Sequence, residues 1–463
     1  MAKITFLGAT GTVSGSKYLI DTGDTRFLVD YGMFQGPKKL RLMNWEPPQM
    51  RPSTVDHVLL THAHIDHSGM LPVLVREGFE GKIWCTPVTA ELCEISLLDA
   101  AHLQEEDARF ANKMGFSKHK PALPLFTTED ASRVISRLRP IEYEKQAQLS
   151  PGTSVRFRDA GHILGSAIVE VTAGNSGKPL RLVFSGDLGR YDALILRDPA
   201  SIGEADYLLV ESTYGDRVHP EEEPLQVLSA IINETARRGG MVVVPSFAVG
   251  RTQTLLYLIR EMKERKLIPD LPVFVDSPMA QRVTEVFCRH IDVFDEEAKA
   301  VFRETGRCPI HCPNLEFVET PKESQRINEM RFPAVIVSAS GMATGGRILH
   351  HLKYRLPDPR NTILFVGYQS VGTRGQILKD GARAIKIHGE MIPVRAQIRA
   401  MDAFSGHADS VEILRWLQKF RQAPKMTFVV HGEPESSKAL AGEIHRSLGW
   451  KTYIPEPLEA YKL

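Results

Sequence analysis

Four potential metal ligands stand within six residues in the segment His62-Ala-His64-Ile-Asp66-His67. A regular helix or strand cannot turn all four side chains toward one point, because their spacing spreads them over several faces. A loop can separate them into two pairs, His62 with His64 and Asp66 with His67. Imidazole and carboxylate groups suit zinc, with manganese and iron as competitors. We therefore expect a metal site here rather than a solvated histidine-rich loop.

A pair of metal ions needs more ligands than this segment supplies. Two ions about 3.5–4 Å apart need additional donors, one of them a bridging carboxylate. Candidates of the right type each follow a short apolar stretch elsewhere in the chain, and they are Asp30, His162, Asp187 and His431. Asp and His also commonly begin turns or cap helices, so any one of these residues alone is weak evidence. Together with the first segment they form a pattern.

The elements that must position these residues are short strands mixed with helices. Strands are expected at 3–7, 17–20, 26–29, 57–60, 181–184 and 207–210, and a helix at 71–78. From about residue 221 the two types alternate regularly, with helices at 224–238 and 252–263 and apolar strands at 241–245, 273–275, 334–337 and 362–366. This order indicates layered α/β architecture with a second, βαβ-type module. A strand near 394, a helix at 411–420 and a strand at 426–430 follow.

Composition and charge exclude several classes of protein. Hydrophobic residues make up 43% and charged residues 24% of the 463-residue chain, which excludes disordered and fibrous proteins. The formal net charge of +1 does not indicate a globally basic nucleic-acid binder, although a local basic groove remains open. No run approaches the ~18 apolar residues of a membrane helix, and the N-terminus lacks the apolar run of a signal peptide. We therefore expect a cytoplasmic protein without a membrane partner.

The five cysteines are an odd number without framework spacing, which is typical of a reducing compartment. Cys308 and Cys312 flank His311 and resemble half of a metal site. A structural zinc site requires a second ligand pair nearby, and none stands there, so this interpretation is disfavoured.

The ligand pattern resembles the metallo-β-lactamase superfamily. The His62–His67 segment matches its signature, and Asp30, His162 and Asp187 match its flanking motifs in order and approximate spacing. Three further motifs resemble those of the β-CASP branch of nucleic-acid nucleases, namely Glu211-Ser-Thr-Tyr-Gly-Asp216-Arg217, Phe404-Ser-Gly-His407-Ala-Asp409 and Val430-His431-Gly-Glu433. The segments Asp276-Ser-Pro-Met-Ala280 and Ser338-Ala-Ser-Gly-Met342 resemble the inserted domain of the RNA-processing members.

This resemblance implies a metallo-β-lactamase αββα sandwich with an inserted β-CASP α/β domain. Residues 1–211 and 394–463 would form the sandwich, and residues 212–393 would form the insertion and roof the cleft. Two zinc ions per chain are implied, the first held by His62, His64 and His162. The second would be held by Asp66, His67 and His431, with Asp187 bridging both ions and Asp30 supporting a ligand histidine from behind.

The same resemblance assigns the catalytic roles to Asp66, Glu211 and His407. Zinc lowers the pKa of bound water from 15.7 to about 7, so a hydroxide bridging the metals would attack the phosphate. His407 would protonate the departing 3′ oxygen, because imidazole is the side chain whose ordinary pKa lies near 6.5. Glu211 would orient the ring and favour its charged form.

A basic segment of the insertion is the expected contact with RNA. Eight Lys or Arg residues stand between Arg347 and Lys386, against two Asp. A glycine-rich turn precedes a helix expected at 348–354, and backbone N–H groups at such a turn bind phosphate well. The residues expected to contact RNA are Ser340, Gly341, Arg347, Tyr368 and Ser405. Phe247, Tyr368 and Phe404 could stack on bases, and core packing is an alternative for Phe247.

The sequence therefore predicts a zinc-dependent ribonuclease that cuts single-stranded RNA, with endonucleolytic cleavage favoured over 5′-exonucleolytic cleavage. A thioester or lactone hydrolase of the same superfamily would need neither the insertion nor the pair Glu211 and His407. A catalytically silent RNA-binding scaffold would have lost metal ligands, whereas every matched position is intact here. A homodimer is plausible by analogy with the family.

Overall fold

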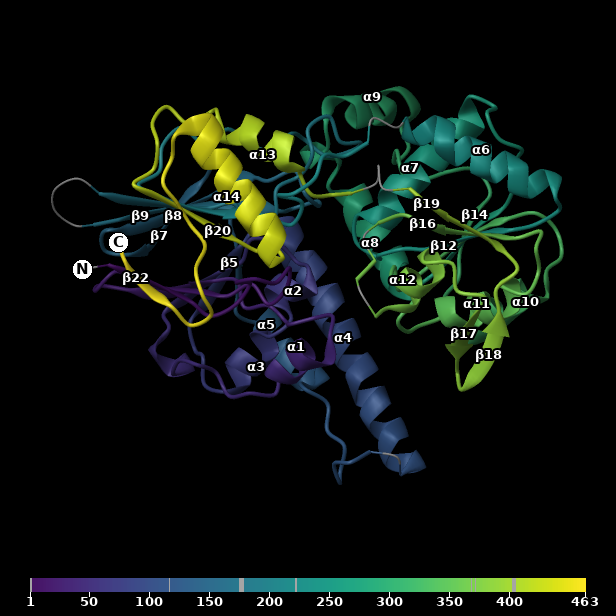
Figure 1. The fold of residues 1–463 in the computed structure, drawn as a ribbon, viewed down its shortest axis with the longest axis horizontal. Coiled ribbons are helices and arrows are strands. Elements are labelled where there is room, and N and C mark those ends of the chain that lie inside the picture. Colours follow the sequence, from purple (N-terminus) through teal and green to yellow (C-terminus); the bar gives the residue numbers. More distant parts are fainter. Residues whose placement is uncertain are drawn as a thin grey trace. The chain divides into compact units, whose positions relative to one another are not determined.

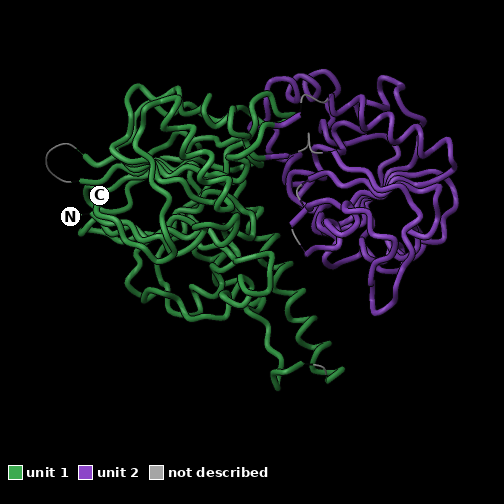
Figure 2. Tube along the Cα trace, viewed as in Figure 1, with its two compact units in different colours: residues 1–218, 407–463 green, residues 219–406 purple. Residues whose placement is uncertain are grey.

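The computed structural model describes residues 2–115, 117–174, 179–220, 223–367, 369–370, 372–401 and 405–463. The chain divides into two compact units, shown in Figure 2. Unit 1 comprises Met1–Val218 and His407–Leu463, and unit 2 comprises His219–Gly406. Unit 2 is thus an insertion within unit 1.

Unit 1 contains two seven-stranded sheets. The first has the order β22 (Ala460–Lys462), β1 (Lys3–Phe6), β2 (Tyr18–Asp21), β3 (Arg26–Val29), β4 (His57–Leu59), β5 (Lys82–Cys85) and β6 (Leu138–Pro140). The second has the order β21 (Thr452–Tyr453), β20 (Met426–Val430), β11 (Tyr207–Glu211), β10 (Leu180–Phe184), β9 (Ala167–Ala173), β8 (Thr153–Asp159) and β7 (Gln146–Ser150).

The main core of unit 1 lies between these sheets. Side chains alternate across each strand, so Leu209 and Phe428 face Phe6 and Phe27 of the other sheet, whereas Leu208 faces outward. The outer face of the second sheet packs against α13 (Ser410–Leu417) and α14 (Pro434–Leu448), as Figure 1 shows. The remaining helical segments of unit 1 are α1 (Lys38–Met43), η1 (Pro52–Thr54), α2 (Ile65–Ser68), α3 (Leu71–Arg76), α4 (Pro87–Met114) and α5 (Thr128–Ile135). This arrangement confirms the αββα sandwich.

The C-terminal segment completes both sheets of unit 1. Strand β20 pairs in parallel with β11 in the second sheet, and β22 pairs antiparallel with β1 in the first. Trp416 of α13 is fully buried, and its indole N–H donates to the carbonyl of Ala200 at 2.9 Å. The sandwich core therefore needs residues beyond the insertion.

Unit 2 has a parallel six-stranded sheet in the order β14 (Leu315–Phe317), β13 (Val273–Asp276), β15 (Val335–Ser338), β12 (Val242–Pro245), β16 (Thr362–Phe365) and β19 (Gln397–Ala400). A hairpin, β17 (Ala384–Ile387) and β18 (Glu390–Pro393), forms a separate two-stranded sheet. The helical segments are α6 (Pro224–Arg237), α7 (Arg251–Glu264), α8 (Pro278–Arg289), η2 (Ile291–Val293), α9 (Glu296–Thr305), α10 (Pro321–Glu329), α11 (Ile348–Arg355) and α12 (Arg374–Lys379).

The expected elements with stated bounds are all present, with ends within three residues of the expected ones. The expected bounds of the insertion, 212–393, differ from those of unit 2, which are His219–Gly406, and the larger difference is at the end. The reason is β19, which pairs with β16 and therefore belongs to the sheet of unit 2. Helix α4 and strands β8 and β9 are among the elements that were not expected, although β8 alternates apolar and charged residues as a strand does.

Among the residues that the structure describes, no helix combines the length and apolar character that crossing a membrane requires.

A disulfide joins Cys288, near the end of α8, to Cys308, with a Cα–Cα distance of 5.5 Å. Cys308 is therefore not half of a metal site with Cys312. The pairing also departs from the expectation of a reducing compartment that the cysteine count suggested. The remaining cysteines, Cys85, Cys93 and Cys312, are buried thiols.

Cysteine alkylation tests this pairing. The denatured, unreduced protein should incorporate label at three cysteines, and prior reduction should raise the number to five, because only the bridge protects two thiols. Intact-mass spectrometry reads both numbers. The variant Cys288→Ser should incorporate four labels without reduction. Five labels in the unreduced wild-type protein would contradict the disulfide.

Candidate metal centre

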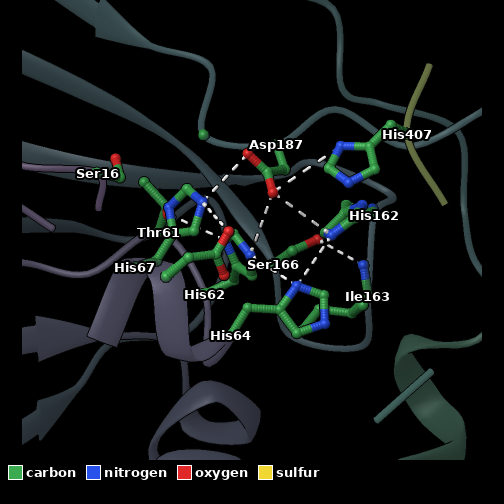
Figure 3. A network of polar contacts seen from close by, with 12 residues as sticks. Ser16, Thr61, His62, His64, His67, His162, Ile163, Ser166, Asp187 and His407 are labelled. Carbon is green, nitrogen blue, oxygen red and sulfur yellow. Dashed lines mark hydrogen bonds and ion pairs between the residues drawn. The ribbon is translucent and has the colours of Figure 1, made fainter. Parts of the chain in front are cut away.

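Three histidine nitrogens converge in what we call the first cluster, which comprises His62, His64 and His162. His64 Nδ1 lies 3.1 Å from His62 Nε2 and 3.2 Å from His162 Nε2. His62 and His64 lie in the loop after β4, and His162 lies in the loop after β8. All three belong to unit 1, and the rings are drawn in Figure 3.

Asp66, His67 and His431 form the second cluster. His67 Nε2 lies 3.2 Å from His431 Nε2, and the Asp66 carboxylate lies 3.9 Å from the first nitrogen and 3.6 Å from the second. Asp66 and His67 stand in the short helix α2, and His431 directly follows β20. The loop and helix thus separate the His62–His67 segment into two pairs.

Asp187 lies between the clusters and is 2% exposed. Its Oδ2 atom faces the first cluster, 3.5 Å from His62 Nε2 and 3.6 Å from His162 Nε2. Its Oδ1 atom faces the second cluster, 3.3 Å from His67 Nε2. Figure 3 shows these lines radiating from the carboxylate. Oδ1 is buried and accepts no well-formed hydrogen bond. A buried, ionised oxygen needs a hydrogen-bond donor or a cation as a partner.

These distances fit zinc. Zn–N bonds of about 2.0–2.1 Å in a tetrahedral site place neighbouring donor atoms about 3.3–3.4 Å apart. The donor separations in the first cluster, including Asp187, range from 3.1 to 3.6 Å. Several lone pairs that converge on one point repel one another, so the arrangement favours a cation in each cluster.

The electrostatics of the centre agree with this interpretation. Burial and the neighbouring rings keep the pKa of His62 well below its ordinary value, and burial lowers the pKa of His64 to about 4. Burial opposes ionisation of Asp66, but a hydrogen bond from His431 and the charge of His67 outweigh it and lower the pKa to about 2. These directions favour the unprotonated form of the candidate ligand atoms of His62, His64 and Asp66, which is the form that metal binding requires.

His67 is the exception. Burial lowers its pKa, but the carboxylates of Asp187 and Asp30 outweigh burial and raise the pKa well above its ordinary value. A protonated ring here supplies the positive charge that the two carboxylates need. Zinc binding at the second cluster would release this proton.

Asp30 fixes the orientation of His67 from behind. His67 Nδ1 donates to Asp30 Oδ2 at 2.7 Å, which leaves Nε2 facing the second cluster. Asp30 also accepts the backbone N–H of Thr61 at 2.8 Å and the hydroxyl of Thr61 at 3.0 Å. The Thr61 hydroxyl in turn lies 3.1 Å from His62 Nδ1, so the same network orients a ring of the first cluster. Ser16 completes it with a bond to Asp30 at 3.1 Å.

Local backbone geometry holds the ligand loops together. The N–H groups of Tyr31 and Met33 donate to the carbonyls of His67 and Ile65. Gly32 between them packs so closely that a Cβ would lie 1.6 Å from the carbonyl oxygen of Asp66. The Ser166 hydroxyl accepts the N–H of His162 at 3.0 Å.

Glu211 and His407 form a pair beside the first cluster. His407 Nδ1 lies 3.2 Å from Glu211 Oε2, and the His407 ring packs at 4.4 Å from that of His162. Glu211 is fixed by the backbone N–H of Leu188, which donates to it at 2.6 Å. The Glu211 side chain is fully buried and that of His407 is 20% exposed, so the histidine is the member that solvent or substrate can reach.

Of the residues expected to contact RNA, Ser340, Gly341, Arg347 and Ser405 are described; they lie in unit 2, and none of these four is fully exposed. Arg347 donates to Asp276 at 2.7 Å and to the carbonyls of Val318 and Glu319, so its guanidinium is engaged within the unit. Ser340 bonds to Thr344 in the glycine-rich turn. Gly341 contacts the Phe247 ring closely. Ser405 is buried, and Tyr368 and Phe404 lie outside the described residues.

Several other cations of the basic segment are also engaged. Lys353 pairs with Glu390, Arg360 pairs with Asp358, and Arg374 donates to backbone carbonyls. Arg355 is buried and donates to the carbonyl of Ile327 at 2.6 Å. The count of eight cations therefore overstates the charge that this segment offers to a ligand.

Sequence reasoning missed the hydroxyl groups behind the ligands. Ser16, Thr61 and Ser166 each bond to a ligand or to Asp30. The one local pattern that could have identified such a group is the position of Thr61, directly before His62 at the end of β4. No local pattern identifies Ser16 or Ser166.

Three family descriptions match the sequence. Residues 10–216 match the metallo-beta-lactamase superfamily, and residues 252–378 match the Beta-Casp domain. Residues 391–455 match the Zn-dependent metallo-hydrolase RNA specificity domain.

The chain also has similar curated proteins. It is 40% identical over 439 residues to Ribonuclease TTHA0252 of Thermus thermophilus, and the match covers 95% of each chain. It is 32% identical over 480 residues to Transcription termination factor FttA of Pyrococcus abyssi, covering 100% of this chain and 71% of the relative. A solved structure of a protein of unknown function from Enterococcus faecalis V583 has a TM-score of 0.54 at 13% identity, covers 100% of both chains and is similar in fold.

The substitution Asp30→Asn tests the support behind His67. In one amide orientation Nδ2 faces the His67 Nδ1 donor, and in the other it faces the Thr61 N–H, so either orientation loses a partner. Zinc affinity at the second cluster should fall by about 10–100-fold. Competition with a chelating dye measures the affinity. Ser16→Ala removes one bond from the same carboxylate but not the link to His67, and should have a smaller effect. Equal affinities in Asp30→Asn and wild type would reject the assignment.

Proposed function

We propose that this chain, which belongs to the β-CASP group of the metallo-beta-lactamase superfamily, hydrolyses phosphodiester bonds of single-stranded RNA with two zinc ions. The observation that carries the proposal is the position of Asp187, with one carboxylate oxygen toward each donor cluster. A single ion would leave one cluster and one carboxylate oxygen uncompensated. Two-ion hydrolases use this type of arrangement to stabilise both the attacking and the leaving oxygen.

The first cluster and Asp187 would hold one zinc ion, and the second cluster with Asp187 would hold the other. When bound, the ions supply a nucleophile at neutral pH and neutralise charge on the phosphoryl oxygens. Asp66 serves as a ligand at the reacting centre, and Asp30 holds His67 in the tautomer that binds metal. These residues align the site before the substrate arrives.

His407 and Glu211 carry out the proton transfer to the leaving group. Glu211 accepts from the Nδ1 side of the His407 ring, and we assign proton donation to Nε2. When protonated, the ring can donate its Nε2 proton to the departing 3′ oxygen while Nδ1 stays bonded to Glu211. The buried position of Glu211 fixes this pair, and the partial exposure of His407 lets it meet a substrate.

RNA as the substrate rests on two similarities. The relative that is 40% identical is named a ribonuclease, and a family description that matches residues 391–455 names RNA specificity. Because the proposed substrate is RNA, we also propose that the protein acts in the cytoplasm. Endonucleolytic cleavage is our preferred mode.

RNA labelled separately at the 5′ and 3′ ends tests the activity and its mode. Endonucleolytic action should give labelled fragments of intermediate length from both labels, with or without a 5′ phosphate. A 5′-exonuclease would release labelled mononucleotides from the 5′ label alone. The absence of any cleavage by the zinc-loaded protein would reject the proposal.

Metal content provides a second prediction. The wild-type protein should contain two zinc ions per chain, and His67→Ala should contain one, because only the second cluster loses a donor. Turnover should fall by several orders of magnitude, while circular dichroism stays unchanged. Elemental analysis measures the metal, and His445→Ala, a histidine outside the centre, is the matched control. No more than trace metal in active wild-type protein would contradict the two-ion site.

The substitution His407→Ala tests the general acid. Both zinc ions should stay bound, and turnover should fall by ~10²–10⁴-fold, the usual effect of general acid catalysis. A 3′-phosphorothiolate substrate has a better leaving group and should recover much of this loss. The exposed His102→Ala variant should behave as wild type. An equal loss on both substrates, or the loss of zinc, would show that His407 does not act as an acid.

A further inference from the structure

Helix α4 connects the metal centre to a distant tip of unit 1. The hydroxyls of Thr86 and Thr89, at its beginning, both donate at 2.7 Å to the carbonyl of Gly165, three residues after His162. The helix has 28 residues, and at 1.5 Å per residue it is about 42 Å long. In Figure 1 its far end extends beyond the other elements of unit 1.

The far end of α4 is held in place by a helix cap and by hydrogen bonds to the returning chain. Gly115 ends the helix in the left-handed conformation with φ 68°. The Asn112 side chain donates to the carbonyl of Ala122 at 2.9 Å and accepts its N–H at 2.7 Å. Nearer the body, Gln104 accepts the N–H of Leu125 at 3.0 Å. These bonds hold the returning chain on one face of α4 and leave the opposite face to solvent.

The far end of α4 and the chain that returns from it are basic and partly apolar. We call Arg109, Phe110, Lys113, Lys118 and Lys120 the basic tip. Residues 109–123 contain these four Lys or Arg and no Asp or Glu, in a chain whose net charge is +1. All four cations are exposed, and none pairs with a carboxylate within the described part of the chain. Phe110 is 58% exposed, and Met114 beside it is 60% exposed.

Exposed cations close in sequence to an exposed aromatic side chain are suited to single-stranded nucleic acid. Lys and Arg neutralise phosphates, and an aromatic ring stacks on bases without a sequence preference. The cations that were expected to bind RNA in unit 2 are largely engaged in that unit, whereas those of the basic tip are not.

We propose that the basic tip is a second RNA-binding surface, which holds a part of the substrate remote from the metal centre. This inference rests on the proposed ribonuclease function. It adds that the affinity for RNA depends on the length of the RNA. A stacked strand advances about 3.4 Å per nucleotide, so about 12 nucleotides are needed to span the length of α4. RNA shorter than this reaches the metal centre but not the basic tip.

The test compares a 6-nucleotide and a 30-nucleotide unstructured RNA with the triple variant Lys113→Gln, Lys118→Gln, Lys120→Gln. Each lost phosphate contact removes about 0.7 from the slope of log affinity against log salt, so the three substitutions remove about 2. At 0.1 M salt this slope corresponds to about 10²-fold weaker binding, and KM for the long RNA should rise by that factor. The kcat value, and both constants for the short RNA, should stay at wild-type values. Phe110→Ala should also raise KM for the long RNA alone.

Direct binding separates this proposal from the proposed function. Fluorescence anisotropy with a slowly hydrolysed phosphorothioate 30-nucleotide RNA should give a salt slope smaller by about 2 in the triple variant. The control Lys145→Gln, Lys419→Gln, Lys451→Gln removes the same charge from exposed positions elsewhere in unit 1 and should keep the wild-type slope.

Three outcomes would overturn the inference. The first is an unchanged KM and salt slope in the triple variant while RNA is still cleaved. The second is an equal change for both RNA lengths. The third is a change in sedimentation mass with unchanged RNA binding, which would make the basic tip a contact between two copies of the chain. If wild-type protein cleaves no RNA but the anisotropy slopes differ as expected, the proposed function fails and the binding surface stands.

Discussion

The burial of one carboxylate, that of Asp187, sets the condition that the rest of the site must satisfy. Moving an ionised carboxylate out of water costs several kcal/mol unless positive charge and hydrogen bonds compensate it. The nearest groups are histidines of both clusters, and most of these rings point lone pairs rather than N–H groups at the same space. Without metal, a protonated His67 supplies one positive charge. Two cations would satisfy both oxygens, so metal binding and the order of this region are coupled.

The position of the insertion follows from the same sheet that carries several of the proposed metal ligands. The chain leaves the second sheet after β11 and returns before β20, the parallel neighbour of β11. The two ends are tied together, because Tyr214 bridges to Asp409 and Ser410 donates to the carbonyl of Arg217. A loop whose ends already meet can accept a whole domain at little cost to the sandwich. Glu211 and His407 flank this junction, so the exit and return of the chain also place the pair to which we assign proton transfer.

The sequence could predict the parts of the site that are local and could not predict those that depend on distant contacts. The His62–His67 segment was recognisable because four ligands stand in six residues. Its partners, His162 and His431, were assigned through a family resemblance, because their proximity depends on strand order. Ser16 and Ser166 had no local pattern, since their roles come from hydrogen bonds made in the folded chain. Unit 2 extends to Gly406, beyond the expected 393, because β19 pairs with β16, and no local pattern in the sequence reveals that pairing.

The charge of the chain shows the same limit of prediction from sequence. Counting cations along the segment from Arg347 to Lys386 treats every guanidinium as available, but Arg347 and Arg355 serve as hydrogen-bond donors inside unit 2. A cation paired with a carboxylate contributes little to the field that a polyanion meets, because the opposite charge cancels it at short range. A buried cation such as Arg355 cannot contact a phosphate directly. Exposed and unpaired cations determine that field. The four in the basic tip are fewer than the eight in the basic segment, yet their whole charge faces solvent. Affinity for RNA therefore depends on where the fold leaves cations without partners, which a count along the sequence does not reveal.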